Sequence, residues 1–158
     1  MKVSIFGLPL VSALLLSGAV ASQQDDRIYY GSRAGMHLTT VSKQGIGSAN
    51  AVIMLKHTPQ DAKAFCVQYE QDNSMACVNQ TLATVKTGDR VTGNCVSRTW
   101  VDMYGKSYAF LGKATKPNLT ADYVLKDLGT GEILNGSSAS GYQVQLTIFQ
   151  QLCPGLAR

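Results

Sequence analysis

Residues 90–111 read RVTGNCVSRTWVDMYGKSYAFL, and this stretch decides the class of fold. It contains two strand-prone runs, RVTGNCV and TWVDM, followed by the turn residues Tyr104-Gly105-Lys106. The chain then returns as SYAFL, residues 107–111. Strand-prone runs joined by a glycine-containing turn are typical of an antiparallel hairpin. We therefore expect a sheet that is built from hairpins rather than from parallel strands.

Similar runs on both sides of this stretch extend the expected sheet. Further strands are expected in residues 27–32, 36–42, 50–57, 121–127 and 132–134. Turns that contain glycine separate these segments, and Gly129-Thr130-Gly131 makes the last two a second hairpin. The pattern predicts an antiparallel sheet of about six or seven strands.

Thr58-Pro59-Gln60-Asp61 is the clearest helix start in the chain. The threonine can cap the helix, the proline suits the first helical position, and the aspartate complements the positive end of the helix dipole. A second helix is expected after Ser74 and is expected to end at Gly88. These two helices lie between the two groups of strands.

Residues 141–152 fit two kinds of element. Apolar residues alternate along 142–148, as in a strand, but they also share one face of a helix. The stop at Pro154-Gly155 and the glutamine-rich opposite face favour a helix, with Ser138 or Ser140 as its N-cap. An antiparallel sheet with two or three helices belongs to the α+β class.

Residues 1–21 have the order of a secretory signal peptide. A basic residue precedes the apolar run Ile5–Leu16, and Ala19-Val20-Ala21 offers small residues at the cleavage site. The run is shorter than the ~20 residues of a spanning helix, and Ser22 stands where a lipoprotein needs cysteine, so no stable membrane anchor is expected. We expect an exported protein, periplasmic or secreted, in which residues 22–158 form a single domain.

The four cysteines are expected to form two disulfides, because an even number in an exported chain is typical of paired thiols. Three pairings are conceivable, and we favour Cys66–Cys77 with Cys95–Cys153. No pair has the C-x-x-C spacing of a zinc site, so no metal ion is expected. A nucleophilic cysteine with His57 as its base stays open as an alternative.

The composition excludes several classes of protein. The chain of 158 residues is 45% apolar and 15% charged, with a formal net charge of +4. These values do not fit a disordered acidic chain, a collagen-like repeat or a charged coiled coil. The lysines and arginines are scattered, so a nucleic-acid partner is not expected.

His37 and His57 are the only histidines. His37 falls on the less apolar face of its strand and His57 precedes a helix, so both are expected at the surface or at strand ends. The run Gly136-Ser137-Ser138-Ala139-Ser140 matches neither a phosphate-binding loop nor a nucleophile elbow. The sequence therefore contains no recognisable catalytic residues and no cofactor motif.

Several runs resemble a group of small exported proteins of rhizobia and related α-proteobacteria. They are YYGSRAGM at residues 29–36, His57-Thr58, GSSASGY at 136–142 and the closing Leu152-Cys153-Pro154. The resemblance covers nearly the whole chain after the signal peptide. It implies an exported bacterial protein, allows a role at a host interface, and implies no particular activity.

A second resemblance concerns only the serine- and glycine-containing loop. Residues 138–142, SASGY, are similar to a stretch of the periplasmic C-type lysozyme inhibitors, which are small β-barrels that insert such a loop into the lysozyme active site. The tyrosine here follows the glycine directly, and no tryptophan comes downstream. The resemblance implies a contact role for Ser138, Ser140 and Tyr142.

Together, these features predict an exported protein that binds a protein or a component of the cell envelope, without a catalytic activity. One alternative is a protein like the lysozyme inhibitors, which would act through the loop 135–142. Another is a small hydrolase that uses His37 or His57 with nearby carboxylates.

Overall fold

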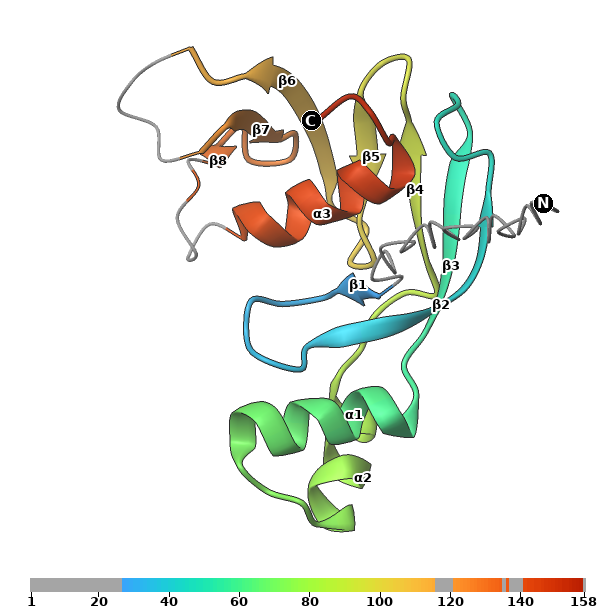
Figure 1. Ribbon diagram of the computed structural model, residues 1–158, viewed down its shortest axis with the longest axis vertical. Coiled ribbons are helices and arrows are strands. Elements are labelled where there is room, and N and C mark those ends of the chain that lie inside the picture. The colour runs from blue at the N-terminus through green and yellow to red at the C-terminus, as the bar shows by residue number, and fades with distance from the viewer. Residues whose placement is uncertain (1–26, 116–120, 135, 137–140, 158) are drawn as a thin grey trace, which may run out of the picture.

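The computed structural model describes residues 27–115, 121–134, 136 and 141–157. Their centre is one antiparallel sheet of eight strands, in which each strand pairs with the next in the chain. The strands are β1 (Ile28–Tyr29), β2 (His37–Gln44), β3 (Ala51–Lys56), β4 (Arg90–Asn94), β5 (Thr99–Val101), β6 (Ser107–Lys113), β7 (Tyr123–Asp127) and β8 (Ile133–Leu134). The expected α+β class is confirmed, with the sheet curving around one helix (Figure 1).

The expectation of six or seven strands was wrong, because the sheet has eight. The stretch from Arg90 to Val101 is divided into β4 and β5 by a tight turn. The side-chain oxygen Oδ1 of Asn94 accepts hydrogen bonds from the backbone nitrogens of Val96 and Ser97. Arg98 then adopts a positive φ of 58° before β5 begins. An asparagine turn of this kind reverses the chain within four residues.

The main core lies between the sheet and α3 (Tyr142–Leu152), which crosses in front of the strands (Figure 1). Strand β3 shows the alternation that one buried face requires. Phe149 on α3 stacks on Phe110 with ring centroids 4.7 Å apart and lies 5.0 Å from the Trp100 ring. At Gly93, a Cβ atom would lie 3.1 Å from Leu152, so the glycine lets α3 approach β4 closely.

The segment that fitted both a strand and a helix is helical, as expected. The structure gives Gly141, with a φ of 70°, as its N-cap, without a side-chain capping hydrogen bond, and the expected caps Ser138 and Ser140 lie outside the described residues. Gln145 fixes the helix to the sheet. Its side chain accepts a hydrogen bond from Trp100 Nε1 at 3.0 Å and donates one to Asp102 Oδ2 at 3.0 Å.

A helical lobe packs on the outside of the sheet beside β2 (Figure 1). It comprises α1 (Pro59–Phe65), the π-helical segment η1 (Cys66–Glu70) and α2 (Met75–Thr84). Thr58 caps α1 and Ser74 caps α2, as expected, but α2 ends at Thr84 rather than at Gly88. The lobe has its own small core, in which Ala62, Cys66 and Val78 are buried.

Both expected disulfides are present. Cys66–Cys77 joins η1 to α2 within the lobe, and Cys95–Cys153 joins the β4–β5 turn to the end of α3. All four cysteines of the chain are therefore paired. Within the described ranges, no helix has both the length and the apolar character that crossing a bilayer requires. The proposed signal peptide, residues 1–21, lies outside the described residues.

Candidate functional site

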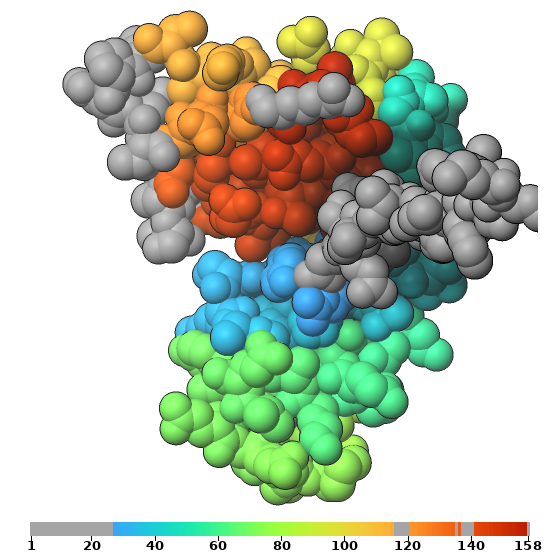
Figure 2. Space-filling model, in the orientation of Figure 1, coloured from blue at the N-terminus to red at the C-terminus, as the bar shows by residue number. Residues whose placement is uncertain are grey.

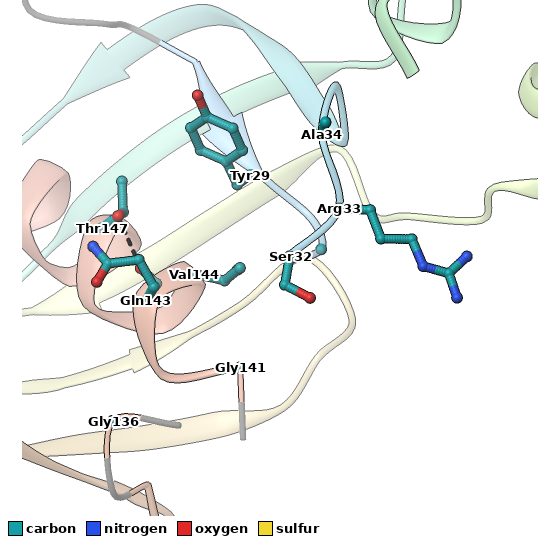
Figure 3. A pocket seen from close by; sticks show the side chains of 10 residues that line it. Tyr29, Ser32, Arg33, Ala34, Gly136, Gly141, Gln143, Val144 and Thr147 are labelled. Atoms are coloured by element: carbon teal, nitrogen blue, oxygen red, sulfur yellow. Dashed lines mark hydrogen bonds between the residues drawn. The ribbon is translucent and has the colours of Figure 1, made fainter. Parts of the chain in front are cut away.

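A pocket of about 500 Å³ opens between the segment after β1 and the start of α3 (Figure 3). Its described walls come from two parts of the chain more than a hundred residues apart, at 29–34 and at Gly136 with 141–147. The side chains that line it include Tyr29, Ser32, Ala34, Gln143, Val144 and Thr147. Three glycines, Gly31, Gly136 and Gly141, also line it. Its volume lies in the range of ~300–1,000 Å³ that is usual for ligand sites.

The chemistry of this pocket is neutral. An aromatic ring and aliphatic carbons form most of its walls, with hydroxyl and amide groups from Ser32, Gln143 and Thr147. Arg33 is the one cation among its lining residues, and its guanidinium lies 4.7 Å from the centre of the Tyr69 ring. Figure 3 shows this side chain pointing away from the other labelled ones. Such walls suit an uncharged, largely apolar group.

Two of the runs that carried the resemblance meet at this pocket. The run 29–36 supplies one wall, and the run 136–142 supplies Gly136 and Gly141. Sequence patterns singled out both runs but gave no sign that they lie together. Their proximity arises from the packing of α3 against β1, and it could not be deduced from spacing along the chain.

The expected contact residues do not all fall at this site. Ser138 and Ser140 lie outside the described residues, so a lysozyme-binding loop stays a prediction. Tyr142 is 5% exposed and belongs to the main core. Its hydroxyl accepts a hydrogen bond from the backbone nitrogen of Tyr123 at 3.2 Å, and burial raises its pKa. Its ring supports the base of α3 and is not presented to a partner in this conformation.

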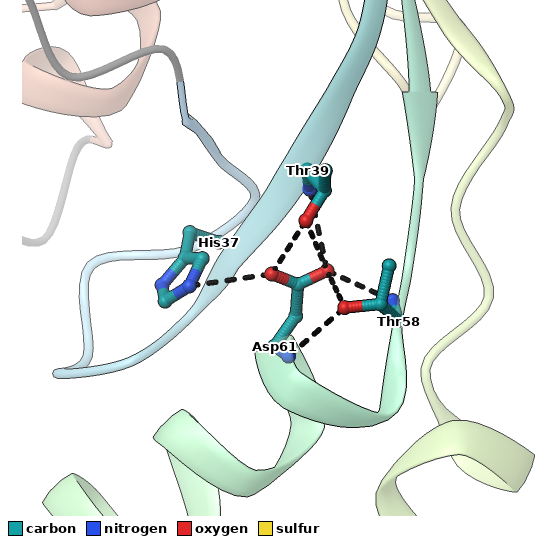
Figure 4. Close-up of polar contacts among 4 residues, drawn as sticks. All are labelled: His37, Thr39, Thr58 and Asp61. Atoms are coloured by element: carbon teal, nitrogen blue, oxygen red, sulfur yellow. Dashed lines mark hydrogen bonds and ion pairs between the residues drawn. The ribbon is translucent and has the colours of Figure 1, made fainter.

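A group of polar residues, which we call the His–Asp cluster and which is buried at His37 and Asp61, joins α1 to β2. It consists of His37, Thr39, His57, Thr58 and Asp61, of which Figure 4 draws all but His57. The Asp61 carboxylate, 3% exposed, is its centre. It accepts hydrogen bonds from Thr39 Oγ1 at 3.0 Å and from both the backbone nitrogen and the hydroxyl of Thr58 at 2.8 Å. His37 Nε2 lies 3.3 Å from the carboxylate oxygen Oδ1 of Asp61.

The surface position expected for His37 was wrong, because only 6% of the residue is exposed. The residue is on the outward face of β2, as the alternation indicated, but α1 covers that face. Strand periodicity distinguishes the two faces of a sheet. It does not reveal that a helix from elsewhere in the chain packs on the outer one.

His57 is the unusual member of the cluster. Both of its ring nitrogens are buried, and neither has a hydrogen-bond partner among the described residues. The Tyr30 ring lies edge-on to it, with centroids 5.5 Å apart, and the Tyr30 hydroxyl is also buried without a partner. Burial raises the pKa of Tyr30 to about 12. Burial also lowers the pKa of His57, and the nearby Asp61 carboxylate opposes this shift.

The two histidines and a carboxylate thus lie close together, as a hydrolase would require. Their contacts, however, hold α1 against β2. Hydrogen bonds from the Thr39 hydroxyl and from the backbone nitrogen and hydroxyl of Thr58 occupy the carboxylate, and the nitrogens of His57 are shielded from solvent. A general base must reach the proton that it removes. Among the described residues, no group of three or more histidine, cysteine or acidic side chains could hold a metal ion. The cluster fastens the helical lobe to the sheet.

Comparisons of the chain with protein-family models, with curated proteins and with solved structures find no match. Of the two candidate sites, the pocket is open to ligands from solvent, whereas in the His–Asp cluster His37 and Asp61 are buried and the ring nitrogens of His57 are shielded.

Proposed function

We propose that this is an exported binding protein whose pocket receives an apolar side chain of a partner protein. The observation that carries the proposal is the pocket itself, which two distant segments of the chain build from neutral side chains and glycines. Sites of this kind recognise a partner by burying an aromatic or aliphatic anchor in a preformed hollow. A glycine-edged pocket admits such an anchor without rearrangement of side chains.

Export is supported by two independent features. The segment 1–21 has the order of a signal peptide, and all four cysteines of the chain are in disulfides, which persist in oxidising compartments. The chain resembles small exported proteins of rhizobia and related bacteria. This resemblance would place it in the periplasm or outside the cell. A protein partner there, from the envelope or from a host, is the expected ligand.

Mass spectrometry of the protein recovered from an exporting bacterium tests the first part of this proposal. We expect a chain that begins at Ser22 and that is lighter by four hydrogens than its fully reduced form, because two disulfides have formed. Non-reducing and reducing digests would then identify the two pairs. An intact Met1 together with four free thiols would contradict export.

Binding of small side-chain analogues tests the pocket. We expect N-acetyltryptophanamide to bind weakly and to shift the backbone NMR signals of Gly31, Ser32 and Gln143, because these residues line the hollow. A single apolar anchor contributes about 2–3 kcal/mol, so a Kd on the order of ten millimolar is expected. Gln143→Trp and Ser32→Trp place an indole in the pocket from opposite walls, and each should weaken binding by about tenfold.

Val96→Trp is the matched control for these two variants. Val96 is 81% exposed in the β4–β5 turn, on a different element from either wall of the pocket. The Val96→Trp variant adds the same indole to the surface and should leave binding of the analogue unchanged. The proposal fails if the analogue shifts no signal around the pocket, or if all three variants weaken its binding equally.

A further inference from the structure

The wall of the pocket at residues 31–34 continues directly into Gly35, which rests on the helical lobe. A Cβ atom added to Gly35 would lie 2.5 Å from the backbone of Ala64 and Phe65, so the backbones of this wall and of α1 are in contact. Arg33 reaches across to the Tyr69 ring on η1. In Figure 2 the blue segment, which begins at residue 27, lies between α3 above it and the helical lobe below it. The position of the lobe therefore sets the position of this wall.

The His–Asp cluster holds the lobe in that position. Asp61 on α1 takes its hydrogen bonds from Thr39 on β2 and from Thr58, and His37 on β2 faces the same carboxylate. The cluster also contacts the first residues of the pocket wall. Tyr29, which lines the pocket, lies edge-on to His37 with ring centroids 6.1 Å apart, and the next residue, Tyr30, packs on His57.

We propose that the His–Asp cluster makes binding in the pocket sensitive to pH: protonation of His57 in mild acid loosens α1 from β2, displaces the wall at 31–34 and releases the ligand. This inference rests on the proposed function, because it concerns the regulation of the same pocket. Its structural basis is a half-buried imidazole at the joint between the sheet and the lobe that supports the wall, whose two ring nitrogens are shielded from solvent and have no hydrogen-bond partner among the described residues.

The groups that face His57 decide the direction of the effect. They are Tyr30 from the segment after β1, His37 from β2 and Asp61 from α1. The Asp61 carboxylate is the single negative charge among them, and donors from Thr39, Thr58 and His37 already occupy it. A proton on His57 would add a buried cation beside a second imidazole. Burying a charge without a full set of partners is unfavourable.

The sign of the pH dependence follows from the lowered pKa of His57 in the packed state, for which burial is the main cause. A loosened lobe would return this imidazole to its ordinary pKa of about 6.5 and would bind more protons than the packed state. The stability of packing is therefore complete above about pH 6.5 and declines as the pH falls through that value. Mild acid favours the loosened state, and neutral pH favours the packed state.

The test compares the affinity of N-acetyltryptophanamide at about pH 7.5 and about pH 5, on either side of the ordinary imidazole pKa. The native protein is expected to bind about fivefold more weakly at the lower pH, which is a usual size for coupling between sites. His57→Gln removes the titrating group but keeps a neutral polar side chain, and it should bind equally at both values. If His57→Gln retains the native pH dependence, or if the native protein shows none, the inference is overturned.

Hydrogen exchange in the absence of any ligand gives a second, independent measurement on the native protein. Lowering the pH should increase the corrected exchange of amides in 31–36 and in α1, and it should leave β6 and α3 unchanged. Unchanged protection in 31–36 and α1 would overturn the coupling even if the pocket binds. Absence of analogue binding at both pH values would instead refute the proposed function, while the exchange measurement still decides whether the cluster controls the wall.

Discussion

Replacing Cys95 and Cys153 together with alanine is expected to lower the free energy of unfolding by about 4 kcal/mol. The disulfide closes a loop of 153 − 95 + 1 = 59 residues, which includes β5 to β8 and α3, so its loss frees a large part of the unfolded chain. Cys153 is fully buried at the end of the helix that covers the sheet. Urea unfolding followed by tryptophan fluorescence measures the change directly, because Trp100 stacks in this core. The midpoint of thermal unfolding should fall by about 10 °C.

The second disulfide provides the comparison. Cys66 and Cys77 close a loop of 77 − 66 + 1 = 12 residues, for which the same model gives about 3 kcal/mol, and this loop lies wholly within the helical lobe. Their double alanine variant should lose protection in α1 and α2 while the environment of Trp100 stays native. An equal fluorescence response from both variants would contradict the view that the lobe and the sheet have separate cores.

Local signals predicted the elements of this fold where the cause was local. The run Thr58-Pro59-Gln60-Asp61 begins α1 because its cap, proline and aspartate act within one turn of helix. The end of α2 was missed because Val85, its C-cap, is already extended, with ψ at 110°. Nothing in the run up to Gly88 indicates that the chain must leave the helix early to reach β4.

The number of strands depended on a feature that periodicity does not register. The stretch 90–103 contains two strand-prone runs between which no turn was expected, yet Asn94 turns the chain back and Cys95 is tied to the end of α3. Turn chemistry at Asn94 was present in the sequence and could have marked the division. The two-residue strands β1 and β8 pair only at the sheet edges, and their short lengths are set by their neighbours.

The candidate site was the least predictable part. The pocket forms from residues 29–34, Gly136 and residues 141–147 only because α3 returns across the sheet to β1. Similarly, the aspartate expected to complement the dipole of α1 also receives Thr39 and His37 from β2, which are about twenty residues away in sequence. A sequence shows which side chains could take part in such contacts. The packing of the elements decides which of them meet.

Asp61→Ala is expected to lower the free energy of unfolding by about 3 kcal/mol, the second large effect. The substitution removes the N-terminal capping box of α1 and leaves the hydroxyls of Thr39 and Thr58 without their acceptor. His37, buried beside the carboxylate, loses this partner as well. Because the lobe is held to β2 through this group, the loss should also increase hydrogen exchange in residues 31–36. Urea unfolding and hydrogen exchange on the same variant measure the two effects.

Asp72→Ala separates the role of burial from that of a helix start. Asp72 also precedes a helix and also accepts a backbone hydrogen bond, from Ser74 at 2.7 Å, but it is exposed to solvent. Water can replace its carboxylate, so a much smaller loss of stability than at Asp61 is expected, with exchange in 31–36 unchanged. If the Asp61 and Asp72 variants lost similar stability, Asp61 would act as a local cap alone. A much larger loss at Asp61, together with exposure of the pocket wall, is expected because that carboxylate joins two layers of the fold.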